Sequence, residues 1–261
     1  MKKLKVMYCG TPDFSVPTLE LLYNHPNIDL VKVISMPDRP AGRGQKLQSP
    51  PVAEFAKNHK LPLIQTENIN KDEDALNDFL ITKCDLIVVL AFAQFLGSKV
   101  LNHPKEGCFN IHTSLLPKYR GAAPIQYALL NGDKTSGVSI QKMVKKMDAG
   151  DLVHSFELPI NQNETGGQLY TRLKFQAALS MNSLINELLD GSVKYIPQDE
   201  AGVSFAPTLK KVDGLIDFKN SDYETIHNQI RALDPWPGTY CFLNKKRLKV
   251  FEIEKDLSKL E

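Results

Sequence analysis

Short apolar runs alternate with segments of helical periodicity along the first half of the chain, and this alternation is the strongest constraint on its fold. The apolar runs, read as strands, are 4–9, 30–34, 61–64, 86–90 and 108–111, and the helical segments are 15–23, 52–58, 72–83 and 125–130. In the segment DLIVVLA at 85–91 every residue after Asp85 is apolar, which indicates a strand buried on both faces. The pattern predicts an α/β fold with a doubly wound, Rossmann-like and mostly parallel sheet.

The second half of the chain extends this sheet and adds a smaller region. Segments 137–143 and 152–158 read as a strand pair, and 165–189 reads as a long amphipathic helix. From 191 to 208 the periodicity is lost and Gly, Pro and Ser accumulate, which predicts a linker. The rest carries predicted strands at 214–218, 239–243 and 247–253 and a helix at 223–232. We therefore predict a large domain at 1–190, a linker at 191–208 and a small β-rich domain at 209–261, which is short for a core of its own.

Composition narrows the class of protein. Hydrophobic residues make up 42% of the chain, and 32 basic against 30 acidic residues leave a formal net charge of +2, so a polyanionic partner would have to be met by local patches. Four cysteines without C-x-x-C spacing favour reduced thiols over disulfides or a zinc site. The sequence has no signal-peptide pattern and no membrane-spanning stretch. We expect a cytoplasmic monomer that has no membrane contact and binds no metal.

A turn-rich segment, FNIHTSLLPKYRGAAP at 109–124, follows the fifth predicted strand. Asn110 and His112 are two residues apart at the strand end, so their side chains leave the same face and can converge on one atom. An amide donor beside an imidazole suits a developing oxyanion, and the imidazole can also move a proton. Asp148, in the loop sequence DAGD, is the candidate carboxylate. The alternative interpretation is a histidine that caps a strand and an aspartate that begins a turn.

Other catalytic devices are missing from the sequence. It contains no nucleophile elbow, and Gly10-Thr11-Pro12 does not complete the pattern G-x-G-x-x-G. Covalent catalysis and dinucleotide binding are therefore disfavoured. The residues favour direct transfer between two bound substrates, with the protein stabilising a tetrahedral intermediate.

The segment PDRPAGRGQKLQSP at 37–50 is longer than a connection in a parallel sheet needs, and its Pro and Gly content predicts irregular structure. Arg39, Arg43 and Lys46 contribute three positive charges against the single negative charge of Asp38. Arginines on a Gly-rich backbone can contact phosphates and base edges of a nucleic acid. A solvated surface loop is the alternative interpretation.

The motifs together resemble a known family. The string NIHTSLLPKYRG at 110–121, with DAGD at 148–151, resembles the signature of the folate-dependent formyltransferases. Five further motifs are similar to the branch of that family that acts on methionyl-tRNA: GTPDF at 10–14, PDRPAGRG at 37–44, KLQSPPV at 46–52, GAAPIQ at 121–126 and PWPGT at 235–239. The resemblance covers nearly the whole chain. It implies formyl transfer from 10-formyltetrahydrofolate to the α-amino group of methionine on initiator tRNA.

The resemblance also implies roles for individual residues. Asn110, His112 and Asp148 match the catalytic residues of the family. The turn that matches its tetrahydrofolate site is Ser114, Leu115, Leu116 and Pro117, and the rim at Gln94, Phe95 and Leu96, with 144–147, should wall the pterin. Phe92 is expected in the core, and an aromatic-glycine turn is more usual in the family where Phe92-Ala93-Gln94 stands here. Arg39, Arg43 and Lys46 match a loop that enters the top of the tRNA acceptor stem.

The resemblance leaves open which substrate accepts the formyl group. In the family the chain continues as a complete small β-barrel that grips tRNA, so 209–261 is expected to be part of an OB-like barrel, shortened at Glu261, with weaker tRNA binding. A sugar-nucleotide formyltransferase would use the same Asn, His and Asp, but PDRPAGRG and GAAPIQ favour the tRNA enzyme. A glycinamide ribonucleotide formyltransferase would be shorter. A folate-binding protein without turnover would lack one of the three polar residues, and all three are present.

Overall fold

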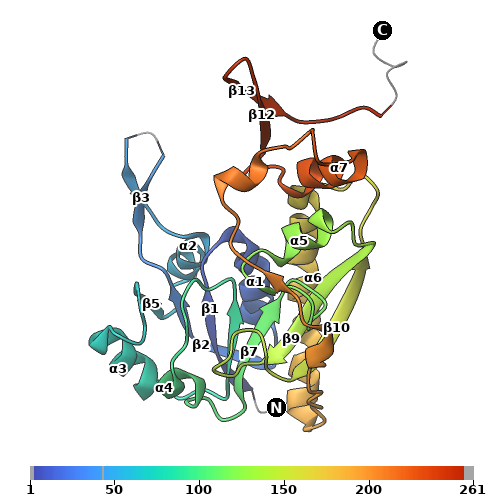
Figure 1. Ribbon diagram of the computed structural model, residues 1–261. Coiled ribbons are helices and arrows are strands. Elements are labelled where there is room, and N and C mark those ends of the chain that lie inside the picture. Colours follow the sequence, from blue (N-terminus) through green and yellow to red (C-terminus); the bar gives the residue numbers. More distant parts are fainter. Residues whose placement is uncertain (1–2, 43, 256–261) are drawn as a thin grey trace. The chain divides into compact units, whose positions relative to one another are not determined.

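The computed structural model describes residues 3–42 and 44–255 (Figure 1). Its contacts divide the chain into two compact units, the first built from 1–112, 138–156 and 174–198 and the second from 113–137, 157–173 and 199–261. Both units are therefore assembled from segments that are far apart in the sequence. Among the described helices, none combines the length and the apolar character needed to cross a membrane.

A seven-stranded sheet dominates the first unit, in the order β10-β9-β7-β6-β1-β2-β5. The strands are β1 (Leu4–Gly10), β2 (Ile28–Ser35), β5 (Leu63–Gln65), β6 (Leu86–Leu90), β7 (Gly107–His112), β9 (Thr135–Lys142) and β10 (Leu152–Pro159). The neighbours from β5 to β7 pair in parallel, and β9 pairs with β7 in the antiparallel direction. The predicted α/β fold with a mostly parallel, doubly wound sheet is confirmed.

Helices connect the parallel strands. They are α1 (Val16–Asn24), α2 (Pro51–Asn58), α3 (Glu73–Ile81) and α4 (Ser98–Leu101), and α6 (Gly166–Asp190) follows β10. Local chemistry sets where they begin: α2 starts on a proline, which suits the first helical turn, and the Asp72 carboxylate accepts a hydrogen bond from the Ala75 amide at 3.1 Å to cap α3. In Figure 1, α1 and α2 lie beside β2, with which they make contact.

The register of β6 and β7 decides which way the polar strand-end residues point. Ile87 pairs with Cys108 and Val89 pairs with Asn110. Ile87, Val89 and Cys108 belong to one buried cluster that also contains side chains from α3 and α4. Because alternate residues of a strand share a face, Asn110 and then His112 leave β7 on this same face, at its carboxyl end. The fold thus places two polar groups where the apolar packing stops.

Residues 37–50 differ from the prediction of irregular structure. They form a small antiparallel hairpin of β3 (Arg39–Ala41) and β4 (Lys46–Gln48), in which Arg39 pairs with Gln48. The turn is possible because Gly42 and Gly44 adopt positive φ angles of 67° and 92°. The proline in β3 is tolerated because this ribbon has only edge strands, where a missing amide donor breaks no ladder. Glycine and proline here shape a strand pair rather than prevent one.

The second unit contains short elements around α5 (Pro124–Leu130) and α7 (Tyr223–Ala232). Its strands are β8 (Arg120–Gly121), β11 (Phe205–Ala206), β12 (Thr239–Leu243) and β13 (Lys246–Val250), and it also holds the 3-10 turns at Glu200–Gly202 and Lys211–Gly214. The strand predicted at 214–218 is wrong, since only Leu215 makes a bridge, to Tyr240. The Asp213 carboxylate accepts a hydrogen bond from the Lys210 amide at 2.6 Å, and this local bond favours the turn over a strand.

Candidate active site

The first unit brings the three predicted catalytic residues together. The amide nitrogen Nδ2 of Asn110 lies 3.4 Å from Oδ1 of Asp148, and Nδ1 of His112 lies 3.9 Å from the same oxygen. The second distance is within ion-pair range but too long for a hydrogen bond. The side chains of His112 and Asp148 are only 7% and 12% exposed. A carboxylate so shielded from water interacts strongly with nearby donors.

Gln141 also belongs to this cluster. It was not among the site residues predicted from the sequence. It lies opposite Asn110 in the antiparallel pairing of β7 and β9, and its Nε2 donates to Oδ1 of Asp148 at 3.0 Å. Its own Oε1 accepts a hydrogen bond from the Gly150 amide at 3.1 Å. The available signal was the glutamine inside the predicted strand 137–143, because an amide that becomes buried in a strand needs partners.

The loop between β9 and β10 is held in place at Asp148–Gly150. Nε2 of Gln198 donates to the carbonyl oxygens of Asp148 at 2.9 Å and Gly150 at 2.7 Å. Asp148 has a φ of 49°, a left-handed conformation that aspartate tolerates better than most residues. No sequence signal links Gln198 to this loop, since it follows about fifty residues later. The structure shows that the carboxylate is positioned by backbone and side-chain contacts together.

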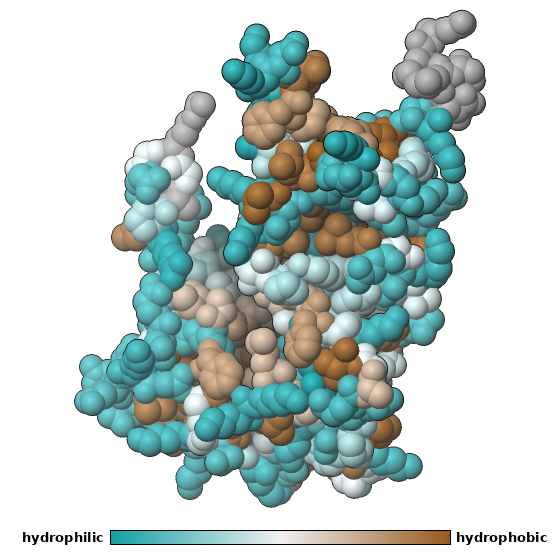
Figure 2. Space-filling view, viewed as in Figure 1, coloured by the Kyte–Doolittle hydropathy of each residue, from teal (hydrophilic) through white to brown (hydrophobic). Residues whose placement is uncertain are grey.

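The predicted folate rim separates into exposed and buried parts. Phe95 is 59% exposed, and Val144 and Met147 are 47% and 59% exposed. Figure 2 shows that apolar side chains, coloured brown, reach the surface of the molecule among hydrophilic ones. Leu96 and Phe92 are buried in the cluster beneath α3 and α4, so the core position expected for Phe92 is confirmed.

The side chain of Gln94 forms hydrogen bonds within the protein. Its Oε1 accepts from the Ile69 amide at 2.8 Å, and its Nε2 donates to the carbonyl oxygen of Thr66 at 2.5 Å. The loops after β5 and β6 are thereby joined.

The predicted folate turn, Ser114–Pro117, belongs to the second unit. The Ser114 hydroxyl donates to the carbonyl oxygen of Lys118 at 2.6 Å, which closes the turn internally. The Tyr119 amide donates to Oγ of Ser204 at 2.9 Å, and the Ser204 amide donates to the carbonyl oxygen of Pro117 at 3.4 Å. Leu116 is buried. Within this unit the turn is therefore held by hydrogen bonds to Ser204, which immediately precedes β11.

The predicted basic residues lie on the β3–β4 hairpin, apart from Arg43, which is outside the described residues. Nη2 of Arg39 is 2.6 Å from Oε2 of Glu67, and both side chains are exposed. Lys46 is also exposed. At the base of the hairpin, hydrogen bonds from Lys57 and Gln65 lower the pKa of Asp38 to about 2, so this carboxyl is ionised at neutral pH.

The arrangement supplies the parts that an acyl-type transfer needs. An amide N–H and an imidazole sit at the end of one strand, beside a carboxylate that other groups hold in place. Donors of this kind stabilise charge that develops on a carbonyl oxygen, and a carboxylate can receive a proton. The cluster can therefore support attack of an amine on a carbonyl carbon without a covalent enzyme intermediate.

Comparison with known proteins gives the same class. Residues 2–185 match the family model described as formyl transferase, and residues 208–260 match the model of the formyl transferase C-terminal domain. Fold and family match together define a formyl-transferring enzyme. The methionyl-tRNA formyltransferase of Bacillus velezensis is 40% identical over 257 residues, which are 98% of this chain and 80% of the relative. That of Geobacter sulfurreducens is 39% identical over 97% of this chain and 79% of the relative. The chain belongs to the formyl transferase family and, within it, to the methionyl-tRNA formyltransferases.

Solved structures share the fold at lower identity. An N-formyltransferase from Helicobacter canadensis, in complex with folinic acid and dTDP-3-aminofucose, has a TM-score of 0.71 at 24% identity and covers 96% of this chain and 87% of its own. A 4-N formyltransferase from Francisella tularensis has a TM-score of 0.74 at 20% identity, covering 97% and 99%. At these identities the likeness shows the fold alone.

Proposed function

We propose that the protein transfers the formyl group of 10-formyltetrahydrofolate to the α-amino group of methionyl initiator tRNA. The observation that carries this proposal is the convergence of Asn110, His112 and Gln141 on Asp148, in a chain that belongs to the methionyl-tRNA formyltransferases. We assign the reaction to a catalytic domain at 1–190, followed by a linker at 191–208 and part of an OB-like barrel at 209–261. We place it in the cytoplasm, in a monomer.

The proposed reaction is a direct attack. The α-amino group, with an ordinary pKa of roughly 7.7 to 8, is available as the free base near neutral pH. Its nitrogen bonds to the formyl carbon, and the carbonyl oxygen gains negative charge that Asn110 and His112 stabilise. Asp148 orients His112 and takes the amine proton through a positioned water. Collapse of the intermediate breaks the bond to N10 of the folate, which leaves as tetrahydrofolate after protonation.

In the first unit, the exposed Phe95, Val144 and Met147 offer apolar surface for a pterin ring, while buried Leu96 and internally bonded Gln94 support the rim from behind. In the second unit, Ser114, Leu115, Leu116 and Pro117 remain the proposed folate turn. No metal takes part in the proposed reaction.

The identity of the formyl acceptor distinguishes the proposed function from its main alternative, a sugar-nucleotide formyltransferase. Purified protein is incubated with 10-formyltetrahydrofolate and either methionyl-tRNA or an amino-sugar nucleotide, and the formylated products are measured. We expect formyl-methionyl-tRNA only. A formylated sugar alone would instead assign the protein to the sugar-nucleotide enzymes. Folate binding without either product would make it a non-catalytic binding protein.

Replacing Arg43 by alanine should raise the KM for methionyl-tRNA about tenfold and leave the KM for the folate unchanged, because one arginine contact to nucleic acid is lost while the folate site is intact. Steady-state kinetics with each substrate varied in turn measures both constants. Lys83→Ala, which removes an exposed positive charge just beyond α3, is the matched control. An equal effect on both substrates, or none, argues against a role of the hairpin in tRNA binding.

A further inference from the structure

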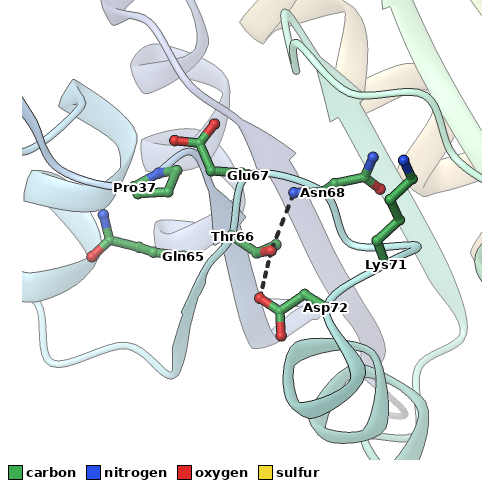
Figure 3. A pocket seen from close by; sticks show the side chains of 7 residues that line it. All are labelled: Pro37, Gln65, Thr66, Glu67, Asn68, Lys71 and Asp72. Atoms are coloured by element: carbon green, nitrogen blue, oxygen red, sulfur yellow. Dashed lines mark hydrogen bonds between the residues drawn. The ribbon is translucent and has the colours of Figure 1, made fainter.

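A cleft of about 420 Å³ opens in the first unit, beyond the carboxyl ends of β2 and β5 (Figure 3). Pro37 and residues of the segment 65–72 line it. A volume of this size is in the range of sites that hold one small ligand and is far too small for a nucleic-acid duplex. None of the residues lining it was assigned to folate or to catalysis.

The cleft has a fixed frame. The Thr66 hydroxyl donates to Oδ2 of Asp72 at 2.7 Å and accepts from the Asn68 amide at 3.3 Å, the two bonds drawn in Figure 3. Asp72 also caps α3 through Ala75, and Gln94 ties the carbonyl oxygen of Thr66 to the predicted folate rim. The cleft wall is therefore hydrogen-bonded to the loop that carries the predicted folate rim in this unit.

Its acidic groups already have partners within the protein. Glu67 pairs with Arg39 at 2.6 Å. The hydrogen bonds from Thr66 and the Ala75 amide lower the pKa of Asp72, which keeps its carboxylate ionised and bonded inside the frame. The charge of Glu67 is thus offset by Arg39, and the Asp72 carboxylate is directed into the frame, toward Thr66 and the start of α3.

The remaining groups are donors. Figure 3 shows Asn68 and Lys71 side by side, with the amide and the ammonium group pointing the same way. Asn68 uses its oxygen to accept bonds from Asn70 at 3.0 and 3.3 Å, which leaves its Nδ2 for a ligand. Within 3–42 and 44–255, Lys71 forms no ion pair. Two adjacent donors, one of them cationic, suit the oxygens of a phosphate group.

We propose that this cleft binds one phosphate-bearing nucleotide of the single-stranded acceptor end of the tRNA, with Lys71 and Asn68 on its phosphate. The inference rests on the proposed function, which supplies an RNA substrate. Its position supports it: the Arg39–Glu67 ion pair joins the cleft to the basic hairpin, and Gln94 joins it to the rim at Phe95. A strand held here lies between the elements assigned to tRNA and those assigned to folate within the first unit.

Direct binding of a short RNA tests the proposal. A fluorescently labelled cytidine-cytidine-adenosine trinucleotide is titrated with wild-type protein, Lys71→Ala, Asn68→Ala and the control Lys83→Ala, and anisotropy gives each Kd. We expect Lys71→Ala and Asn68→Ala to raise the Kd at least fivefold and the control to leave it unchanged. The slope of log Kd against log salt should also fall by about 0.7 in Lys71→Ala, the value for one contact to a single-stranded phosphate. No binding to wild-type protein, or equal Kd values in all four proteins, overturns the inference.

Kinetics separates this inference from the proposed function. Lys71→Ala should raise the KM for methionyl-tRNA and leave kcat and the KM for the folate unchanged. If wild-type protein and Lys71→Ala formylate methionyl-tRNA with the same KM, RNA binding in the cleft is refuted and the proposed function stands. Wild-type protein that binds the trinucleotide through Lys71 but formylates only an amino-sugar nucleotide supports the cleft and refutes the proposed function.

Discussion

Replacing Asn110 by alanine lowers kcat for formyl transfer by about 10² to 10³, because one donor to the developing oxyanion is lost, a change worth about 2.7 to 4 kcal/mol in the barrier. The KM for the folate stays within about twofold, since the donor acts mainly on the transition state. Gln141 still donates to Asp148 at 3.0 Å in this variant, so the carboxylate keeps a partner and the fold is retained. Single-turnover measurement of formyl transfer gives the rate of the chemical step directly.

The control is Asn24→Ala, which removes an exposed amide at the end of α1 whose one hydrogen bond among residues 3–42 and 44–255 goes to the Glu20 carbonyl oxygen. Its kcat should equal that of the wild type. Thermal unfolding of both variants checks that they are folded. A fall in kcat of less than threefold for Asn110→Ala would remove Asn110 from the proposed oxyanion site.

Replacing Gly150 by alanine destabilises the protein by more than about 3 kcal/mol and lowers Tm by at least about 6 °C. A Cβ atom at this position would overlap the carbonyl oxygen of Lys142, a backbone atom that cannot rotate away as a side chain can. The loop must then move, which breaks the bond from the Gly150 amide to Gln141 and displaces Asp148. Activity at low temperature should therefore fall more than tenfold in the molecules that remain folded.

Gly191→Ala separates steric overlap from backbone strain. Gly191 has a φ of 74° but no atom close to its added Cβ, so only the conformational cost of about 1 to 2 kcal/mol applies, and activity should be unchanged. Unfolding in urea and by heat compares the two variants. If Gly150→Ala is no less stable than Gly191→Ala, the close packing of the loop against β9 is not what holds Asp148.

Local patterns predicted most of the elements. The helix expected at 223–232 and the strand at 239–243 are found with the same bounds, because period and turn residues act over a few neighbours. The predictions that were wrong concern segments whose secondary structure depends on whether they find a strand to pair with. The Pro- and Gly-rich segment 37–50 forms a hairpin, since its two halves are free to pair with each other, and 214–218 is no strand because only Leu215 finds a partner.

The sequence by itself determined the sheet, the common face of Asn110 and His112, and the family resemblance that singled out Asp148. A two-residue spacing on a strand has one geometric outcome, whatever surrounds it. Only the tertiary structure decided what holds the carboxylate: the β7–β9 register places Gln141 opposite Asn110, and Gln198 reaches the same loop from about fifty residues later. Hydrogen bonds depend on distances of a few tenths of an ångström between groups far apart in the chain, so they follow from packing and cannot be read from local pattern.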